Sequence, residues 1–97
     1  MPEVISDIVD AYIFRKNHAR IQFLLLLRRA DASLGNTWQG IHEKIEPGET
    51  ALAAAMRAAT QATGLPITEA YAADFINQVY DHTRDKVVLA PVFAFAV

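Results

Sequence analysis

Three glutamates follow one another at three-residue spacing in the middle of the chain: Glu43, Glu46 and Glu49. Hard cations such as Mg²⁺ prefer oxygen ligands and need several of them to converge at about 2.1 Å. These carboxylates could therefore hold a divalent cation that activates a water molecule. Arg57 follows in the next segment, where its guanidinium could pair with one of them or form an ordinary surface ion pair.

The segment after the glutamates has the pattern of a helix, which we expect over Ala51–Thr63. Thr50 is a good N-cap, because its hydroxyl can accept a hydrogen bond from an amide at the helix start. Gly64 can adopt the left-handed conformation that ends a helix. Apolar residues that recur at positions i, i+3, i+4 and i+7 predict a stripe that is buried on one side of the helix. This stripe is formed by Leu52, Ala55, Met56 and Ala59. The predicted helix contains no acidic residue, so it offers no carboxylate to a cation.

Four strands are expected around this helix, in two pairs, each pair joined by a short turn. They are residues 8–15, 20–29, 69–80 and 86–97. The apolar run Phe23–Leu27 predicts burial on both faces of its strand. Strands before and after a helix predict an α+β or mixed α/β sheet with the helix on one face.

Length and composition limit the class of protein. The chain has 97 residues, which we expect to form a single domain over residues 1–97. Its net charge of −2 gives no electrostatic reason to bind nucleic acid or a membrane. It has no cysteine, which excludes disulfides and fits a cytoplasmic location. We expect no signal peptide, and the longest apolar run is far shorter than the roughly 20 residues that span a bilayer.

Residues 43–65 resemble the Nudix box, whose family pattern is G-x5-E-x7-R-E-U-x-E-E-x-G-U, with U a bulky aliphatic residue. The spacing fits without a gap: Glu49 falls on the first glutamate, Arg57 on the arginine and Gly64 on the last glycine. The flanks agree with this match. They include Trp38-Gln39-Gly40 upstream, Lys44 to Thr50 within the loop, Thr63-Gly64-Leu65 at the end, and a strand closing with Leu25 to Arg29.

The resemblance implies a fold and an activity. The fold is a Nudix-like α/β/α sandwich with a mixed sheet, C-terminally truncated, because the family's usual last helix and strand would follow Val97. The activity is Mg²⁺-dependent hydrolysis of the pyrophosphate in a nucleoside diphosphate linked to another group. The expected partner is a nucleotide or another diphosphate small molecule.

The chain departs from the family where the metal is bound. The family takes its Mg²⁺ ligands mainly from glutamates on one helix face, and positions 58, 61 and 62 share that face. They are occupied here by Ala58, Gln61 and Ala62. Glu43 replaces the first glycine of the box. The remaining candidate metal ligands are Glu46 and Glu49, with Glu43 as a further candidate.

The resemblance also assigns roles to individual residues. Glu49 and Arg57 stand at catalytic positions, where their salt bridge would tie the loop to the helix. Candidate substrate-binding residues are Arg28, Trp38 and Glu46. Arg28 could meet phosphates or end its strand in solvent, and Trp38 could stack on a base or pack in the fold. His42, just before Glu43, could be a base or ligand, or have no special role.

Two functions remain open. The first is a pyrophosphohydrolase of weak or altered activity, with Glu43, Glu46 and Glu49 around Mg²⁺. The second is a non-catalytic module that binds a nucleotide or a protein partner, which the missing helix glutamates favour. The apolar segment 87–97 adds a homodimer through the C-terminal strand as a further expectation.

Overall fold

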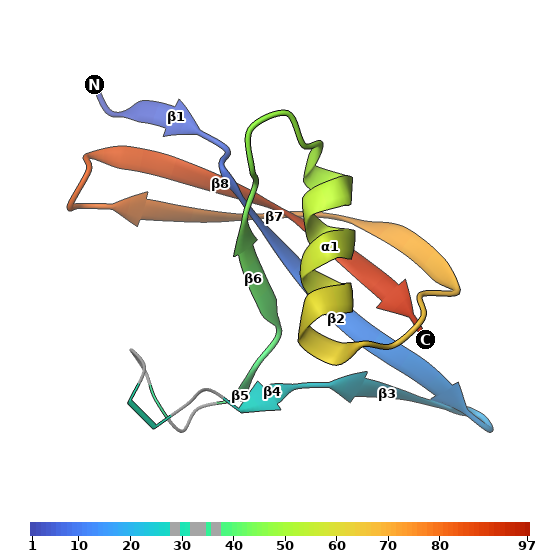
Figure 1. Cartoon of the computed structure of the whole chain (residues 1–97). Coiled ribbons are helices and arrows are strands. Elements are labelled where there is room, and N and C mark those ends of the chain that lie inside the picture. Colours follow the sequence, from blue (N-terminus) through green and yellow to red (C-terminus); the bar gives the residue numbers. More distant parts are fainter. Residues whose placement is uncertain (28–29, 32–34, 36–37) are drawn as a thin grey trace.

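The computed structural model describes residues 1–27, 30–31, 35 and 38–97. Its helix, α1 (Ala51–Thr63), lies on one side of a mixed sheet (Figure 1). The strands of that sheet are β1 (Glu3–Ile5), β2 (Ile8–Asn17), β3 (Arg20–Leu24), β6 (Ile41–Lys44), β7 (Glu69–Asp81) and β8 (Lys86–Ala96). A second, two-stranded sheet pairs β4 (Leu26–Leu27) with β5 (Trp38–Gln39). The predicted mixed α and β architecture is confirmed.

The C-terminal strand β8 lies in the interior of the sheet. It pairs in parallel with β1 and β2 along one edge, and antiparallel with β7 along the other. Strand β2 in turn pairs antiparallel with β3 and β6. This central position explains the apolar composition of residues 87–97, because a strand between two neighbours is buried more fully than an edge strand.

The face of α1 that packs on the sheet consists of alanines. Ala54, Ala55, Ala58 and Ala59 are buried against Val9, Ala11, Ile13, Ile41 and Phe95. The predicted stripe is right for Ala55 and Ala59 but wrong for Leu52 and Met56, which are 42% and 38% exposed. Small side chains allow the helix to lie close to the sheet, so the larger ones turn outward.

Both predicted ends of the helix are confirmed. The Thr50 hydroxyl accepts a hydrogen bond from the amide of Ala53 at 3.1 Å. Gly64 has a φ of 68° and donates its amide to the carbonyl of Thr60 at 2.8 Å. These two caps fix the start and the end of α1.

The prediction that Phe23–Leu27 is buried on both faces is wrong. Phe23, Leu25 and Leu27 are 63%, 46% and 51% exposed. Among the described residues, β3 pairs with β2 alone, so it lies at a sheet edge with an open side. The core under α1 is built from β2, β6 and β8 instead. None of the described helices has the length and apolar character needed to cross a membrane.

Candidate active site

Glu49 and Arg57 form a two-pronged ion pair between the loop and the helix. Arg57 Nε donates to Glu49 Oε2 at 2.9 Å, and Arg57 Nη2 donates to Glu49 Oε1 at 3.1 Å. The side chains are 21% and 28% exposed, so water screens the pair only in part. Two parallel hydrogen bonds also fix the orientation of the guanidinium, which a single contact would not do.

The same two side chains organise the loop between β6 and α1. Arg57 Nη2 also donates to the carbonyl of Lys44 at 3.0 Å, at the end of β6. Glu49 Oε1 accepts the backbone amide of Glu46 at 2.9 Å, and the Glu49 amide donates back to the Glu46 carbonyl at 3.0 Å. The pair therefore ties the strand end, the loop and the helix into one unit.

A cleft of about 260 Å³ lies beside this unit, between β6 and α1. It is lined by Leu26, Gln39, Gly40, Ile41, His42, Glu43, Ala58, Gln61 and Ala62. Helical positions 58, 61 and 62 therefore share one cleft with Glu43. Gln61 is also linked to the ion pair, because Arg57 Nη1 donates to its Oε1 at 3.5 Å.

The donor atoms at this cleft do not fit Mg²⁺. Ala58 and Ala62 supply no ligand, and Gln61 supplies a neutral amide oxygen that already accepts from Arg57. Glu43 Oε1 accepts its neighbour's amide, on Lys44, at 2.9 Å. Within the described residues, no three His, Asp or Glu side chains are arranged to hold a metal ion. Octahedral Mg²⁺ needs converging carboxylates that this arrangement lacks.

Comparison with known proteins identifies the family. A family model for the NUDIX domain matches residues 6–95. The chain belongs to the Nudix family. A search of curated proteins found no match.

Solved Nudix structures share the fold at low sequence identity. A structure described as a Nudix hydrolase of Listeria monocytogenes superposes with a TM-score of 0.75 at 24% identity, over 93% of this chain and 62% of that one. A Nudix hydrolase of M. smegmatis superposes with a TM-score of 0.68 at 20% identity, over 95% of this chain and 62% of that one. The C. elegans Ap4A hydrolase superposes with a TM-score of 0.60 at 20% identity, over 100% of this chain and 70% of that one. The chain thus spans less than two thirds of the length of the Listeria protein, at 62%.

Among the other predicted site residues that the structure describes, Trp38 and Glu46 do not line this cleft. Trp38, on β5, is 64% exposed. Glu46 lies on the exposed loop and contributes its backbone, rather than its carboxylate, to the Glu49 interaction. Arg28 lies outside the described residues.

Sequence reasoning missed Asp10, which contacts His42, and Asn77, which contacts Asp10. Asp10 Oδ1 lies 2.5 Å from His42 Nδ1, and Asp10 Oδ2 accepts from Asn77 Nδ2 at 2.6 Å. The one available signal was Asp10 itself, a charged residue between the apolar Val9 and Ala11 of a predicted strand. Asn77 gives no such signal, because it is 67 positions away from Asp10 and only the sheet brings the two together.

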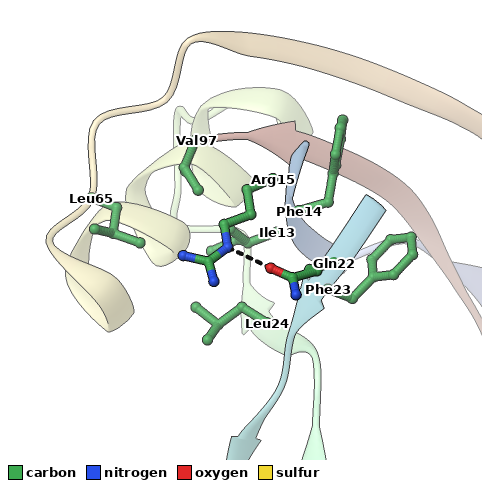
Figure 2. A pocket seen from close by; sticks show the side chains of 8 residues that line it. All are labelled: Ile13, Phe14, Arg15, Gln22, Phe23, Leu24, Leu65 and Val97. Atoms are coloured by element: carbon green, nitrogen blue, oxygen red, sulfur yellow. Dashed lines mark hydrogen bonds between the residues drawn. The ribbon is translucent and has the colours of Figure 1, made fainter. Parts of the chain in front are cut away.

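A larger cavity, of about 520 Å³, lies near the C-terminal end of α1 (Figure 2). Its charged residue is Arg15, whose Nε donates to Gln22 Oε1 at 2.8 Å. The walls are mostly apolar, and Leu65 is the only residue of the Nudix box that lines it. This cavity is therefore separate from the cleft beside Gln61.

The ion pair predicts a specific acid dependence of stability. The hydrogen bond from Arg57, and after it the backbone amide of Glu46, lower the pKa of the Glu49 carboxyl from its ordinary 4.5. A carboxyl with a lowered folded-state pKa stabilises the fold above its unfolded pKa and loses that contribution as the pH falls through the folded one. We therefore expect Glu49→Gln to be less stable than the wild type at pH 7, with a difference that shrinks as the pH falls below 4.5.

Urea unfolding of both proteins at pH 7, 5, 4 and 3 measures this difference. The matched control is Glu46→Gln, in the same loop, whose carboxylate makes no hydrogen bond within the described residues. A Glu49→Gln difference that stays constant down to pH 3 would show that the carboxylate charge contributes nothing.

Proposed function

We propose that this Nudix domain binds a phosphate-containing, nucleotide-type ligand in the cleft between β6 and α1, and that it hydrolyses such ligands weakly or not at all. The observation that carries the proposal is the cleft lining of Ala58, Gln61 and Ala62, with no helix carboxylate. The family membership supplies the ligand class, a nucleoside diphosphate linked to another group.

The chemistry of pyrophosphate hydrolysis supports weak or lost turnover. The transition state gathers negative charge on the phosphoryl oxygens, and enzymes of this kind neutralise that charge with metal ions. Three carboxylates that anchor one metal act as a unit, so removing all of them costs orders of magnitude in rate. Any remaining hydrolysis would depend on Glu43, Glu46 and Glu49, and Glu49 has both oxygens engaged.

Gln61 gives the cleft a way to hold an anion without a metal. A guanidinium only donates hydrogen bonds, so the amide oxygen of Gln61 must face Arg57. Its amide nitrogen is therefore directed away from Arg57 and can donate to a phosphate oxygen.

Three wider assignments accompany this proposal. The protein acts in the cytoplasm, as its lack of cysteine favours. Its ligand is a small molecule, and a neighbour in fold that is described as an Ap4A hydrolase makes dinucleoside polyphosphates one class to test. The expected homodimer through the C-terminal strand would have to use a face of β8, because its two edges are paired with β1 and β2 and with β7.

The test combines turnover with binding. Phosphate release from ATP, ADP-ribose and Ap4A is measured with Mg²⁺, and binding of inorganic pyrophosphate is followed by NMR at the side-chain amide of Gln61 with and without Mg²⁺. We expect pyrophosphate to bind without Mg²⁺ and turnover to be very slow. Gln61→Leu should weaken pyrophosphate binding about tenfold, the loss of one hydrogen bond to a charged group.

Gln78→Leu serves as the control, because Gln78 lies on β7 and does not line the cleft. Robust Mg²⁺-dependent turnover by the unmodified chain would overturn the proposal in favour of an active pyrophosphohydrolase. Pyrophosphate binding that Gln61→Leu leaves unchanged would place the anion elsewhere.

A further inference from the structure

The β2–β3 hairpin and the end of α1 enclose the cavity of about 520 Å³ (Figure 2). Ile13 packs in the core under α1, and Arg15 lies two residues further along β2, so both side chains point to the face that α1 covers. On β3, Leu24 lies opposite Ile13 and Gln22 lies opposite Arg15. Leu65, which follows the C-cap of α1, lines the same cavity. The cavity therefore lies on the helix side of the hairpin.

The guanidinium of Arg15 is held in one orientation and has donors left over. Its Nε donates to Gln22 Oε1 at 2.8 Å. A guanidinium carries five N–H donors, so four remain on Nη1 and Nη2. Neither nitrogen forms a hydrogen bond or an ion pair with any residue that the structure describes. Figure 2 shows them turned away from Gln22, between Leu24 and Leu65.

The available edge of this guanidinium matches a carboxylate. Because Gln22 engages Nε, a bidentate pair has to use the edge formed by Nη1 and Nη2. A carboxylate brings two oxygens to that edge and one negative charge, which equals the charge of one guanidinium. A phosphate monoester carries nearly two negative charges and three acceptor oxygens, which is more than Arg15 alone can satisfy.

The rest of the cavity suits an apolar body. Its walls include Ile13, Leu24, Leu65 and Val97. Apolar walls with a few well-placed polar groups are the usual composition of a small-molecule site, and the volume lies in the usual range for one. Each methylene group that leaves water for such walls adds to the affinity. The expected ligand is therefore a carboxylate attached to an apolar chain or ring.

The charge of the hairpin favours an anion independently of this contact. The sequence has no acidic residue between Asp10 and Asp31, whereas Arg15, Lys16 and Arg20 all lie on the hairpin. The whole chain carries a net charge of −2, so the hairpin is opposite in sign to the protein as a whole. A local positive charge raises the concentration of anions around it.

We propose that the cavity between the β2–β3 hairpin and the end of α1 binds a small monocarboxylate with an apolar body, of the kind of a medium-chain fatty acid. Arg15 is the residue that binds the carboxylate, and Gln22 is the residue that orients it. The site is separate from the cleft beside Gln61, and the assignment does not depend on the proposed function. It uses no metal and no catalytic step.

Octanoate, 1-octanol and acetate, titrated separately into the ¹⁵N-labelled chain, test the two halves of the site. We expect octanoate to produce saturable shifts of the Arg15 Nε–H, the side-chain amide of Gln22 and the backbone amide of Leu65. 1-Octanol lacks the carboxylate and acetate lacks the apolar body, so each should bind at least about tenfold more weakly. Inorganic pyrophosphate should leave Arg15 unchanged, because it has no apolar body.

Three variants examine the two named side chains. Arg15→Met keeps an apolar stem but removes the donors, so it should weaken octanoate binding about tenfold. Arg20→Met is the control, because it removes the same charge from the hairpin at a position that does not line the cavity. Its effect should be less than about twofold. Gln22→Leu removes the partner of Arg15 Nε, so it should weaken the binding of octanoate but not of 1-octanol.

The three substituted side chains are exposed, so the variants should keep the fold. Binding of 1-octanol as tight as that of octanoate would overturn the carboxylate site. Equal losses in Arg15→Met and Arg20→Met would show that the charge of the hairpin, and not Arg15, holds the anion. Octyl phosphate that binds more tightly than octanoate would assign the site to a phosphate monoester instead.

Two further outcomes separate this site from other surfaces. Shifts that spread along the exposed edge strand β3 without saturation would contradict the proposal, because they would report general contact with apolar side chains. Octanoate shifts at Arg15 without a pyrophosphate response at Gln61 would overturn the proposed function of the cleft and leave this site standing.

Discussion

Replacing Ala58, Gln61 and Ala62 together with glutamate is expected to raise the Mg²⁺ affinity of the chain at least about tenfold. A carboxylate about 4 Å from a unit charge contributes about 4 kcal/mol at an effective dielectric constant of 20. A tenfold change in affinity needs only about 1.4 kcal/mol, so even a partly solvated site should exceed it. All three positions line the same cleft, where their carboxylates can converge. Isothermal titration with MgCl₂ measures the affinity.

The matched control places the same three charges on the outer face of α1. Ala53, Met56 and Thr60 are exposed and have a similar three- and four-residue spacing, so Ala53→Glu, Met56→Glu and Thr60→Glu add equal charge away from the cleft. We expect this control to bind Mg²⁺ no more tightly than the wild type does. Equal gains in both triple variants would mean that charge alone, and not the assigned register of the box, determines binding.

Phe95→Ala is expected to remove a large part of the stability of the domain. Phe95 is fully buried, at 0% exposed, among the alanines of α1 and the inward side chains of β2. Truncation of a buried phenylalanine costs about 3–5 kcal/mol, against a total of about 5–15 kcal/mol for a typical domain. The free energy of unfolding in urea, followed by circular dichroism, measures the loss.

Phe75→Ala is the control, because Phe75 lies on β7 and is 61% exposed. An exposed substitution of this kind should change stability by less than about 0.5 kcal/mol. Equal and small effects of both variants would contradict the central position of β8 and the core built around it.

The features that the sequence predicted correctly depend on local chemistry. The helix bounds follow from a hydroxyl at Thr50 and a left-handed glycine at Gly64, each of which acts within one turn. The Glu49–Arg57 pair joins residues eight positions apart, across a loop whose family pattern extends over both. These contacts can be inferred without knowing how the sheet is arranged.

The features that the sequence did not predict depend on contacts between distant segments. Whether Leu52 or Ala54 faces the core depends on how closely α1 approaches β2 and β8, which helical periodicity does not specify. The apolar run at Phe23 was expected to be buried on both faces, but the sheet order leaves β3 at an edge. The contact between Asp10 and Asn77 exists only because β2 and β7 lie on either side of β8.

Paramagnetic Mn²⁺, titrated into the unmodified ¹⁵N-labelled chain, tests the central claim most directly, because the ion takes the place of Mg²⁺ and broadens the amide signals nearest to it. The absence of carboxylates at positions 58, 61 and 62 predicts no selective broadening of Ala58, Gln61 and Ala62 at submillimolar Mn²⁺. Selective, saturable broadening of those three amides would contradict it, since the cleft would then hold a catalytic cation without the helix glutamates.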